Sequence, residues 1–373
     1  MEAREFRAAV RAWLDSHDLT PPPEALHSLD AQVTQLNRVR GAQFEAGWML
    51  YGWPEAVGGL GGPATLRAVL GEEVARRDLA EAGIYSMIEV LVPTIIDYAS
   101  PALAADMVPR LLSGSEQWCQ GFSEPGSGSD LASLSTRAVA AGDGETWTVS
   151  GQKVWTSLAQ YAARCVLLTR TAPGHGGITA FLLDMTDSSG NTGPGITVRP
   201  LRTMHGVDEF AEVFFDDVTV PSSRMLGRPG DGWKVASDLL PYERSTCFWH
   251  RGAHLFSRLD RLIAQTGDAD AAALGEAYLA LYTTRCRSRE TMRRLTGGGK
   301  LGPETSVDKI LLQTSEQRLF DTARDLLPGV IELDDGSPWR HEFLYSRAAT
   351  IYGGTAEIQR NIIARRLLGL GKD

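Results

Sequence analysis

Two segments far apart in the sequence contain the groups that proton transfer at one site would need. The first, Leu240–Ser245, contains the carboxylate of Glu243, a group that can accept a proton as a general base. The second, Ile351–Arg360, begins Ile-Tyr-Gly-Gly-Thr and has glycine at position 353, which offers backbone but no side chain. We predict that the two segments form walls of one active site, with Glu243 supplying the carboxylate.

Glu243 also has a purely structural interpretation. Pro241 is a residue type found in the first turn of helices, where the helix dipole favours acidic side chains such as Glu243. The dipole would lower the pKa of the carboxyl, whereas desolvation by a bound substrate would raise it. A helix-capping glutamate and a catalytic base are therefore both open interpretations of this residue.

The elements that must position these segments fall into three regions. With 373 residues, 43% of them hydrophobic, the chain is long enough for two or three domains. We expect a mostly helical α+β protein with a helical domain over residues 1–115 and a β-barrel or β-sandwich domain over residues 116–230. Residues 231–373 are expected to form an antiparallel four-helix bundle.

The middle region is rich in β-forming runs that turn residues separate. Thr146–Val149 and Gln152–Trp155 are joined by Ser-Gly, which predicts a hairpin with a glycine turn. No Gly-x-Gly-x-x-Gly sequence follows a strand and opens a helix, so a dinucleotide-binding Rossmann domain is not expected.

After Trp233 the pattern is helical again. Glycine-rich breaks divide this region into four long segments. We expect these segments at about 233–265, 269–295, 305–328 and 340–368.

The composition disfavours several classes of protein. A formal net charge of −9, from 46 acidic and 37 basic residues, argues against a protein that coats nucleic acid or an anionic membrane. Glu89, Pro93 and Asp97 interrupt the most apolar later stretch, Gly83–Ala99, so we expect no membrane span. The four cysteines are widely separated and the histidines lack metal-ligand spacing, so we expect a cytoplasmic protein with neither disulfides nor a metal site.

Four motifs, in sequence order, carry a resemblance to a known family. They are Gln120–Asp130 (QGFSEPGSGSD), Gly151–Ser157 (GQKVWTS), Phe210–Pro221 (FAEVFFDDVTVP) with the following Gly230–Trp233, and Ile351–Arg366. Together they resemble the acyl-CoA dehydrogenases, of a type similar to actinobacterial members, over nearly the whole chain. The order of a helical region, a β region and a helical bundle agrees with that family's fold.

The resemblance implies bound FAD. In the Ser-Glu-Pro-Gly-Ser-Gly-Ser-Asp loop, small residues let backbone N–H groups approach phosphate closely. The indole of Trp155 would flank the isoalloxazine ring, and the hydroxyl of Ser157 would lie near flavin N5, where the family usually has threonine. Without the resemblance, an ordinary turn and a packed core tryptophan would explain these residues. The expected cofactor contacts are Phe122, Ser123, Ser129, Trp155, Ser157, Thr355 and Glu357.

The resemblance also locates the base. Many members carry the catalytic glutamate one residue after the tyrosine of the C-terminal motif, and here that place is Gly353. A subset, which includes the long-chain and isovaleryl types, carries it on the first helix of the bundle, and Tyr242-Glu243-Arg244 matches that site. Glu243 is then the expected base, and Gly353 donates its backbone N–H to the substrate carbonyl. The expected substrate contacts are Ser129, Arg244, Tyr352 and Gly353.

The implied function is FAD-dependent α,β-dehydrogenation of an acyl-CoA or acyl-carrier-protein thioester, in lipid metabolism. An electron-transferring flavoprotein is the expected electron acceptor, and a homo- or hetero-oligomer, a dimer or tetramer, is the expected assembly. A same-fold acyl-CoA oxidase or flavin monooxygenase is one alternative. A non-catalytic partner subunit of a heteromeric dehydrogenase is another, which the presence of Glu243 disfavours.

The chain departs from the family at two places. The Arg-x-x-Phe-Gly sequence and the Gln-x-x-Gly-Gly sequence of many members are missing, and Leu327–Val330 stands where the second is expected. These sequences reach the cofactor of a neighbouring subunit in homotetrameric relatives. We therefore assign no residue to the adenosine end of FAD.

Overall fold

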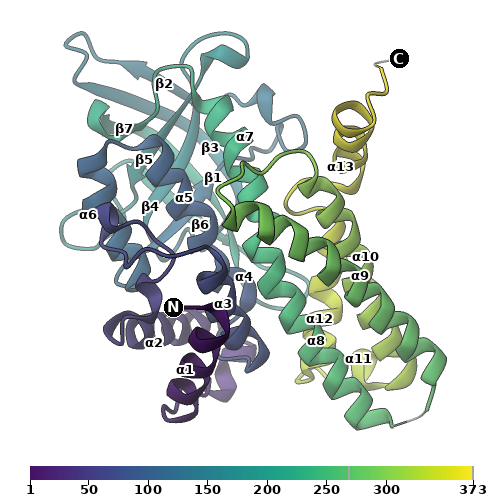
Figure 1. The fold of residues 1–373 in the computed structure, drawn as a ribbon. Helices are drawn as coiled ribbons and strands as arrows, with labels where there is room; N and C mark the ends of the chain where they lie inside the picture. The colour runs from purple at the N-terminus through teal and green to yellow at the C-terminus, as the bar shows by residue number, and fades with distance from the viewer. Residues whose placement is uncertain (268, 372–373) are drawn as a thin grey trace.

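Helices, a β-sheet and further helices follow one another along the chain in the computed structural model, which describes residues 1–267 and 269–371 (Figure 1). The predicted α+β fold, mostly helical with a β region in the middle, is confirmed. The helices of the first region are α1 (Ala3–Asp15), α2 (Leu29–Glu45), α3 (Thr65–Arg76), α4 (Ala82–Ser86), α5 (Ile88–Tyr98) and α6 (Pro101–Leu112).

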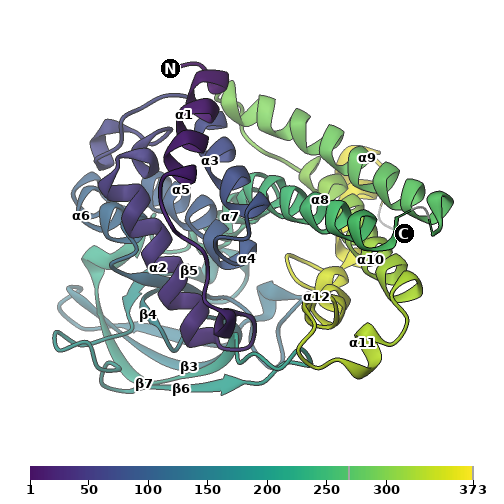
Figure 2. The ribbon, with the colours of Figure 1, turned by 90° about the horizontal axis from the view of Figure 1, so that it is seen from below.

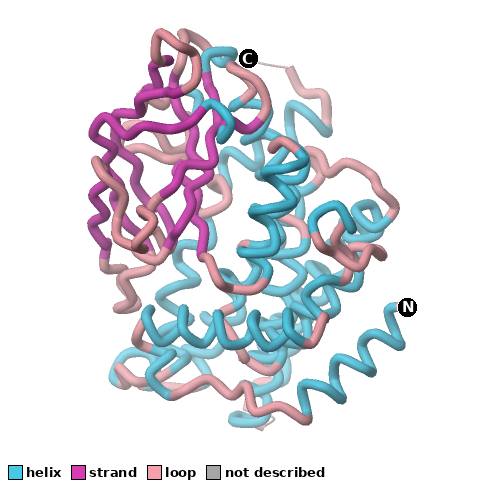
Figure 3. Tube along the Cα trace, turned by 90° about the vertical axis from the view of Figure 1, so that its left-hand side faces the viewer, coloured by secondary structure: helices cyan, strands magenta, loops and turns pink. Residues whose placement is uncertain are grey.

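The described strands form one sheet in the order β6-β7-β3-β2-β4-β5-β8, and β1 pairs in parallel with β4. Figure 3 shows these strands gathered on one side of the molecule. Buried side chains of β4, β5 and β7, such as Leu167, Phe181 and Val213, give this region its own core. The strands are β1 (Gln117–Gly121), β2 (Arg137–Ala140), β3 (Thr146–Ser157), β4 (Ala162–Arg170), β5 (Ile178–Asp184), β6 (Ile196–Leu201), β7 (Phe210–Pro221) and β8 (Met225–Leu226).

The predicted hairpin at Ser-Gly is wrong, because β3 runs through these residues without a turn. Gly151 has φ 151°, and a Cβ atom on it would lie 2.6 Å from the Cα atom of Thr136. The register of β3 against β7 shifts between Val149 and Gly151. The glycine therefore marks a β-bulge where another backbone comes close, and not a chain reversal.

The C-terminal region contains three long helices, α8, α9 and α10, which pack on one another beside the N-terminal helices (Figure 2). Its helices are α7 (Gly232–Glu243), α8 (Thr246–Thr266), α9 (Ala271–Thr296), α10 (Thr305–Leu326), α11 (Val330–Leu333), α12 (Pro338–Ser346) and α13 (Ala356–Ile362), with a π-helix at Ile363–Leu367. Of the described helices, none combines the length and the apolar character that crossing a bilayer requires.

Two of the four predicted long helical segments are interrupted. The first divides into α7 and α8 because Ser245 adopts a non-helical conformation, with φ −112° and ψ −96°. The last is interrupted before α13 by Gly353 and Gly354, whose φ values are 63° and 91°. Both interruptions fall in the segments from which the candidate active site is predicted.

Helix α3 packs on α8 through a close contact between a glycine and a histidine. The His250 side chain is buried, and its Nδ1 atom lies 2.9 Å from the hydroxyl of Ser86. Burial lowers the pKa of His250 to about 4, so its imidazole is neutral at pH 7. The ring fits only because position 71 has no side chain: a Cβ atom on Gly71 would lie 2.1 Å from it.

We expect Gly71→Ala to lower the unfolding temperature, because the added methyl group overlaps the His250 ring and overpacking a core costs about 1–3 kcal/mol. Gly275→Ala in α9 is the matched control, since nothing lies within 4 Å of a Cβ atom there. Replacing a helical glycine at an open position stabilises by about 0.5–1 kcal/mol. Thermal unfolding of both variants checks this, and a Gly71→Ala protein as stable as the control contradicts the packing described.

Candidate active site

The two segments predicted to share a site meet in space. Glu243 is the last residue of α7, and Gly353 lies in the loop that precedes α13. A Cβ atom on Gly353 would lie 3.0 Å from Oε1 of Glu243. The carboxyl of Glu243 therefore occupies the space next to residue 353 into which a side chain of that residue would extend. Because Glu243 ends α7, the helix-capping interpretation, which needed a helix start, is wrong.

Arg244 holds the backbone of the second segment in place. Its Nε and Nη2 atoms donate hydrogen bonds to the carbonyl oxygen of Gly353, at 3.1 and 2.8 Å. The side-chain amide of Gln359 donates to the same oxygen at 3.2 Å. Gly354 has φ 91°, a conformation that favours glycine, and a Cβ atom there would also lie 2.4 Å from Nε2 of Gln359 and displace that amide. The expected substrate contact Arg244 is thus mainly engaged with the protein backbone.

The N–H group of Gly353 is left available by this arrangement. Among the described residues, none accepts a hydrogen bond from it, whereas the preceding N–H of Tyr352 donates to Ala348 at 3.1 Å. A backbone donor without an internal acceptor beside a carboxylate can bind a carbonyl oxygen on which negative charge develops.

The Glu243 carboxyl lies in a partly desolvated environment with two cations nearby. Burial raises its pKa, and the charges of Arg244 and Lys309 oppose that rise. Lys309, on α10, is fully buried, and burial lowers its pKa to about 8. Lys309 could not be recognised from the sequence pattern, because a lysine in a long amphipathic helix normally faces solvent.

Tyr352 is anchored in the bundle next to Gly353. Its hydroxyl donates to Oε2 of Glu316 at 3.3 Å, and Oε1 of Glu316 pairs with Arg251 at 2.8 Å. Its ring lies 4.1 Å from the Nζ atom of Lys309. Tyr352 was expected to contact the substrate, and the structure shows contacts that fix the position of the following glycine.

The serine- and glycine-containing loop lies against β3. The N–H of Val154 donates to the carbonyl of Ser123 at 2.9 Å. The ammonium of Lys153 donates to the carbonyl of Phe122 at 3.0 Å and pairs with Glu124 at 2.8 Å. The expected cofactor residues Phe122 and Ser123 are therefore brought next to the strand that carries Trp155.

Glu124 is the residue that organises this loop. Its carboxylate accepts from the N–H groups of Ser135 and Thr136, at 2.7 and 2.8 Å, in addition to Lys153. Burial opposes ionisation, but Lys153 and these donors outweigh it and lower the pKa of Glu124 to about 2. Glu124 and Lys153 lie in the Gln120–Asp130 and Gly151–Ser157 motifs, but the sequence pattern does not show that they pair.

The side chain of Trp155 is exposed, and its backbone is in a strained conformation. Its φ is 59°, a left-handed value that is uncommon for residues other than glycine, and 62% of its surface is exposed. Among the described aromatic side chains, only Phe210 packs against its ring, in a T-shaped arrangement with 6.0 Å between the ring centroids. Ser157 is the last residue of β3 and lies opposite Phe210 of β7 in the antiparallel register. An exposed indole held by a strained backbone suits the face of a planar cofactor, so these residues fit a flavin ring.

In the part of the chain that the structure describes, the other expected cofactor residues, Ser129, Thr355 and Glu357, make no hydrogen bond with this strand. Ser129 is exposed at the end of the loop. The hydroxyl of Thr355 caps α13 by accepting from Ile358 at 3.3 Å, and Glu357 pairs with Arg360 at 3.7 Å. Among the described residues, the side-chain hydrogen bond of Thr355 and the ion pair of Glu357 are both made with residues of α13.

Glu209 is a further ionisable residue that sequence analysis missed. Its carbonyl accepts from the N–H of Leu158, directly after Ser157, at 2.9 Å. Burial, with a contribution from the charge of Glu81, raises the pKa of Glu209 to about 8. Only the folded loop before β7 brings Glu209 next to the residue that follows β3, so no local pattern could have shown it.

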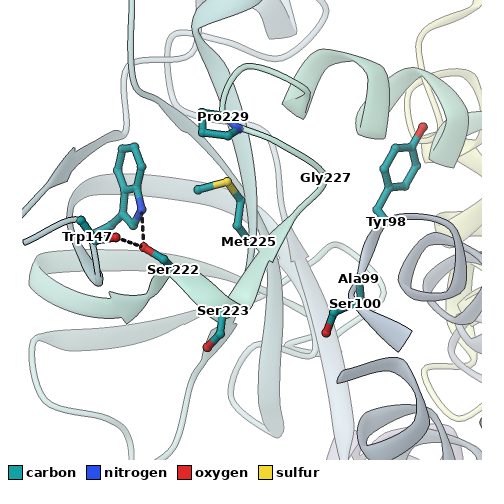
Figure 4. Close-up of a pocket in the computed structure, with 10 residues that line it drawn as sticks. Tyr98, Ala99, Ser100, Trp147, Ser222, Ser223, Met225, Gly227 and Pro229 are labelled. Carbon is teal, nitrogen blue, oxygen red and sulfur yellow. Dashed lines mark hydrogen bonds between the residues drawn. The ribbon is translucent and has the colours of Figure 1, made fainter. Parts of the chain in front are cut away.

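An open pocket of about 590 Å³ lies at a different place, where the end of α5 faces the sheet. Figure 4 shows Tyr98 on one side of it and Trp147 with Ser222 on the other, the indole donating to the hydroxyl at 3.1 Å. None of the predicted site residues lines this pocket, and its lining contains no charged side chain.

Family comparisons cover most of the chain. The family model described as acyl-CoA dehydrogenase, N-terminal domain, matches residues 1–115. The models of the middle and C-terminal domains of the same family match residues 119–218 and 230–368.

Individual proteins show the same similarity. The chain is 36% identical to acyl-CoA dehydrogenase IpdE1 of Mycolicibacterium smegmatis, over 100% of this chain and 99% of the relative. It is also 36% identical to IpdE1 of Mycobacterium tuberculosis, with the same coverage.

Solved structures have the same fold. The ChsE4-ChsE5 complex from Mycobacterium tuberculosis gives a TM-score of 0.83 at 26% identity, over 100% of this chain and 98% of the other. Butyryl-CoA dehydrogenase from Megasphaera elsdenii gives 0.84 at 20% identity, over 98% of each chain.

We expect Gly353→Ala to destabilise the protein by about 2 kcal/mol or more. Left-handed backbone costs a residue with a side chain about 1–2 kcal/mol, and the new methyl group would also press on the Glu243 carboxyl. Gly298→Ala is the matched control, because its φ is 74° and nothing lies within 4 Å of a Cβ atom there. Thermal unfolding should show a larger loss for Gly353→Ala than for the control.

The contact itself is tested by adding Glu243→Ala to Gly353→Ala. If the methyl group meets the carboxyl, the double variant loses less stability than the two single losses added together. Strictly additive losses contradict a contact between residues 243 and 353.

Proposed function

The chain belongs to the acyl-CoA dehydrogenase family of flavin-dependent oxidoreductases, and we propose that it oxidises an acyl thioester to the 2-enoyl thioester with Glu243 as the general base. The observation that carries this proposal is the position of the Glu243 carboxyl, whose Oε1 lies 3.0 Å from where a Cβ atom of residue 353 would be. A carboxylate is present beside the backbone of residue 353, although residue 353 has none of its own.

The proposed reaction divides two hydrogens between two acceptors. The α C–H bond breaks and its proton goes to Glu243, while the β hydrogen leaves with both bonding electrons as a hydride and a C=C bond forms. FAD, when bound, supplies the acceptor for that hydride. The N–H of Gly353 would donate to the thioester carbonyl and stabilise the charge that develops on it when the α-proton leaves.

Arg244 and Tyr352 have positioning roles in this proposal. Arg244 holds the carbonyl of Gly353 through two hydrogen bonds. Tyr352, the residue before Gly353, is held by the hydrogen bond from its hydroxyl to Glu316. With both neighbours held, the Gly353 N–H keeps one direction relative to Glu243. Such preorganisation lets a donor stabilise developing charge without reorganising during the reaction.

Phe122, Ser123, Trp155 and Ser157 would hold the flavin ring in this proposal. The support is that the loop and β3 are hydrogen-bonded together and that the indole of Trp155 is exposed on a strained backbone. Ser129, Thr355 and Glu357 are proposed as cofactor contacts on the sequence resemblance.

In this proposal, the pKa of Glu243 determines the pH below which the activity falls. Burial raises that pKa, and the protonated carboxyl cannot take the α-proton. Activity should therefore increase as the pH rises through the pKa of Glu243, above the range of an exposed glutamate.

The assembly and the electron acceptor are further parts of the proposal. One solved relative is named as a complex of two proteins, ChsE4 and ChsE5, which supports association of this chain with further subunits. We propose an electron-transferring flavoprotein as the acceptor. Formation of hydrogen peroxide during turnover would instead identify an oxidase.

We expect Glu243→Gln to lower kcat by a factor of about 10² to 10⁴ while the purified protein still contains flavin, because the amide keeps the shape of glutamate but takes up no proton. The measurement is anaerobic bleaching of the flavin with a panel of acyl-CoA thioesters, alongside the visible absorbance of the protein.

The matched control is Glu276→Gln, which removes an exposed carboxylate from α9. It should keep the wild-type rate. A Glu243→Gln protein that bleaches at nearly the wild-type rate would show that another group is the base. Purified wild-type protein without flavin would favour a non-catalytic partner subunit.

A further inference from the structure

Lys309 is a buried cation whose position the proposed reaction does not yet explain. Its side chain has no exposed surface. Among the described residues, its ammonium donates only to a backbone carbonyl, that of Ala349, and forms no ion pair. Burial of an ammonium group without a paired carboxylate is costly, so its position calls for a reason beyond packing.

The ammonium end of Lys309 contacts the segment that leads to Gly353. The ammonium bonds to the carbonyl of Ala349 and lies 4.1 Å from the ring centroid of Tyr352. The Cε atom lies 3.7 Å from the point that a Cβ atom on Gly353 would occupy. Lys309 therefore borders the same small space as Oε1 of Glu243, which lies 3.0 Å from that point.

Of the two carboxylates that attract Lys309, Glu316 has another cationic partner, whereas Glu243 has no ion pair among the described residues. Glu243 and Glu316 attract the ammonium of Lys309, and Arg244 repels it. Glu316 already has Arg251 at 2.8 Å and the hydroxyl of Tyr352 at 3.3 Å. The guanidinium of Arg244 is directed at the carbonyl of Gly353. Across Gly353, the ammonium of Lys309 and the carboxylate of Glu243 thus remain as opposite charges.

We propose that Lys309 is a positioning residue that keeps Glu243 in its ionised, proton-accepting form and fixes the backbone of residues 349–353 beside it. The proposal rests on the function proposed above for Glu243. In this account, one buried side chain performs both tasks: its charge acts on the base, and its hydrogen bond and ring contact act on the segment that carries the Gly353 N–H.

The direction of the electrostatic effect follows from the sign of the charge. A nearby cation stabilises a carboxylate and lowers its pKa, which offsets part of the increase that burial causes. The pKa of Lys309, lowered to about 8 by burial, still leaves its ammonium charged at the acidic pH values at which a carboxyl titrates. Without that charge the pKa of Glu243 rises, and Glu243 becomes protonated at a higher pH.

The test is the pH dependence of kcat/KM for Lys309→Gln and Lys309→Met. Glutamine retains a donor for the carbonyl of Ala349, whereas methionine removes the donor as well as the charge. The acid limb is the part of this pH profile in which kcat/KM falls as the pH is lowered. We expect it to move to higher pH by about one unit in both variants, with kcat/KM rising towards its plateau at still higher pH. Lys309→Arg, which keeps the charge, should bring the limb back towards its wild-type position.

Lys234→Met is the matched control, since it removes the same charge from an exposed lysine on α7, the helix that carries Glu243. It should leave the acid limb in place. A lower plateau in the Lys309 variants without movement of the limb would overturn the proposal, because a purely structural lysine would act in that way. If Lys309→Met does not fold, Lys309→Gln decides the result.

An infrared titration separates this inference from the proposed function. The carboxyl band of Glu243, assigned by its loss in Glu243→Gln, reports protonation without substrate. A midpoint that rises by about one pH unit in Lys309→Gln supports the proposal even if no tested thioester is oxidised. An unchanged midpoint overturns it, even if the wild-type protein is an active dehydrogenase.

Discussion

The contact between the Glu243 carboxyl and Gly353 constrains both halves of the candidate active site. A side chain at position 353 would extend to within 3.0 Å of Oε1 of Glu243, so the two positions cannot both carry a large group in this geometry. The carboxylate therefore reaches the site from α7, and residue 353 contributes only backbone. The left-handed conformation at Gly353, with φ 63°, reinforces the same requirement for glycine.

Three further residues, Arg244, Tyr352 and Lys309, hold the Gly353 segment or lie beside it. Arg244, the residue after Glu243, donates to the carbonyl of Gly353, so two consecutive residues at the break between α7 and α8 both reach the Gly353 segment. Tyr352 is anchored through Glu316 and Arg251 in the bundle. Lys309 adds a buried positive charge from α10. The helices of the bundle thus determine where a loop with little structure of its own lies.

Sequence patterns predicted what depends on local motifs and missed what depends on tertiary packing. The helix–β–helix order could be inferred from contiguous sequence patterns, and the pairing of Glu243 with Gly353 from the resemblance of two separate motifs to the family. Lys309 could not, since it lies on a helix whose pattern does not mark a buried lysine as functional. The predicted turn at Gly151 failed for a related reason: a glycine that admits a neighbouring backbone looks, in sequence, like a glycine that reverses the chain.

The most direct test of the account is a crystal structure of the protein with FAD and an unreactive acyl-CoA analogue. The account predicts that the α-carbon lies within contact distance of the Glu243 carboxylate and that the thioester carbonyl accepts a hydrogen bond from the Gly353 N–H. An analogue whose α-carbon faces a different carboxylate, with Glu243 turned away from it, would contradict the account.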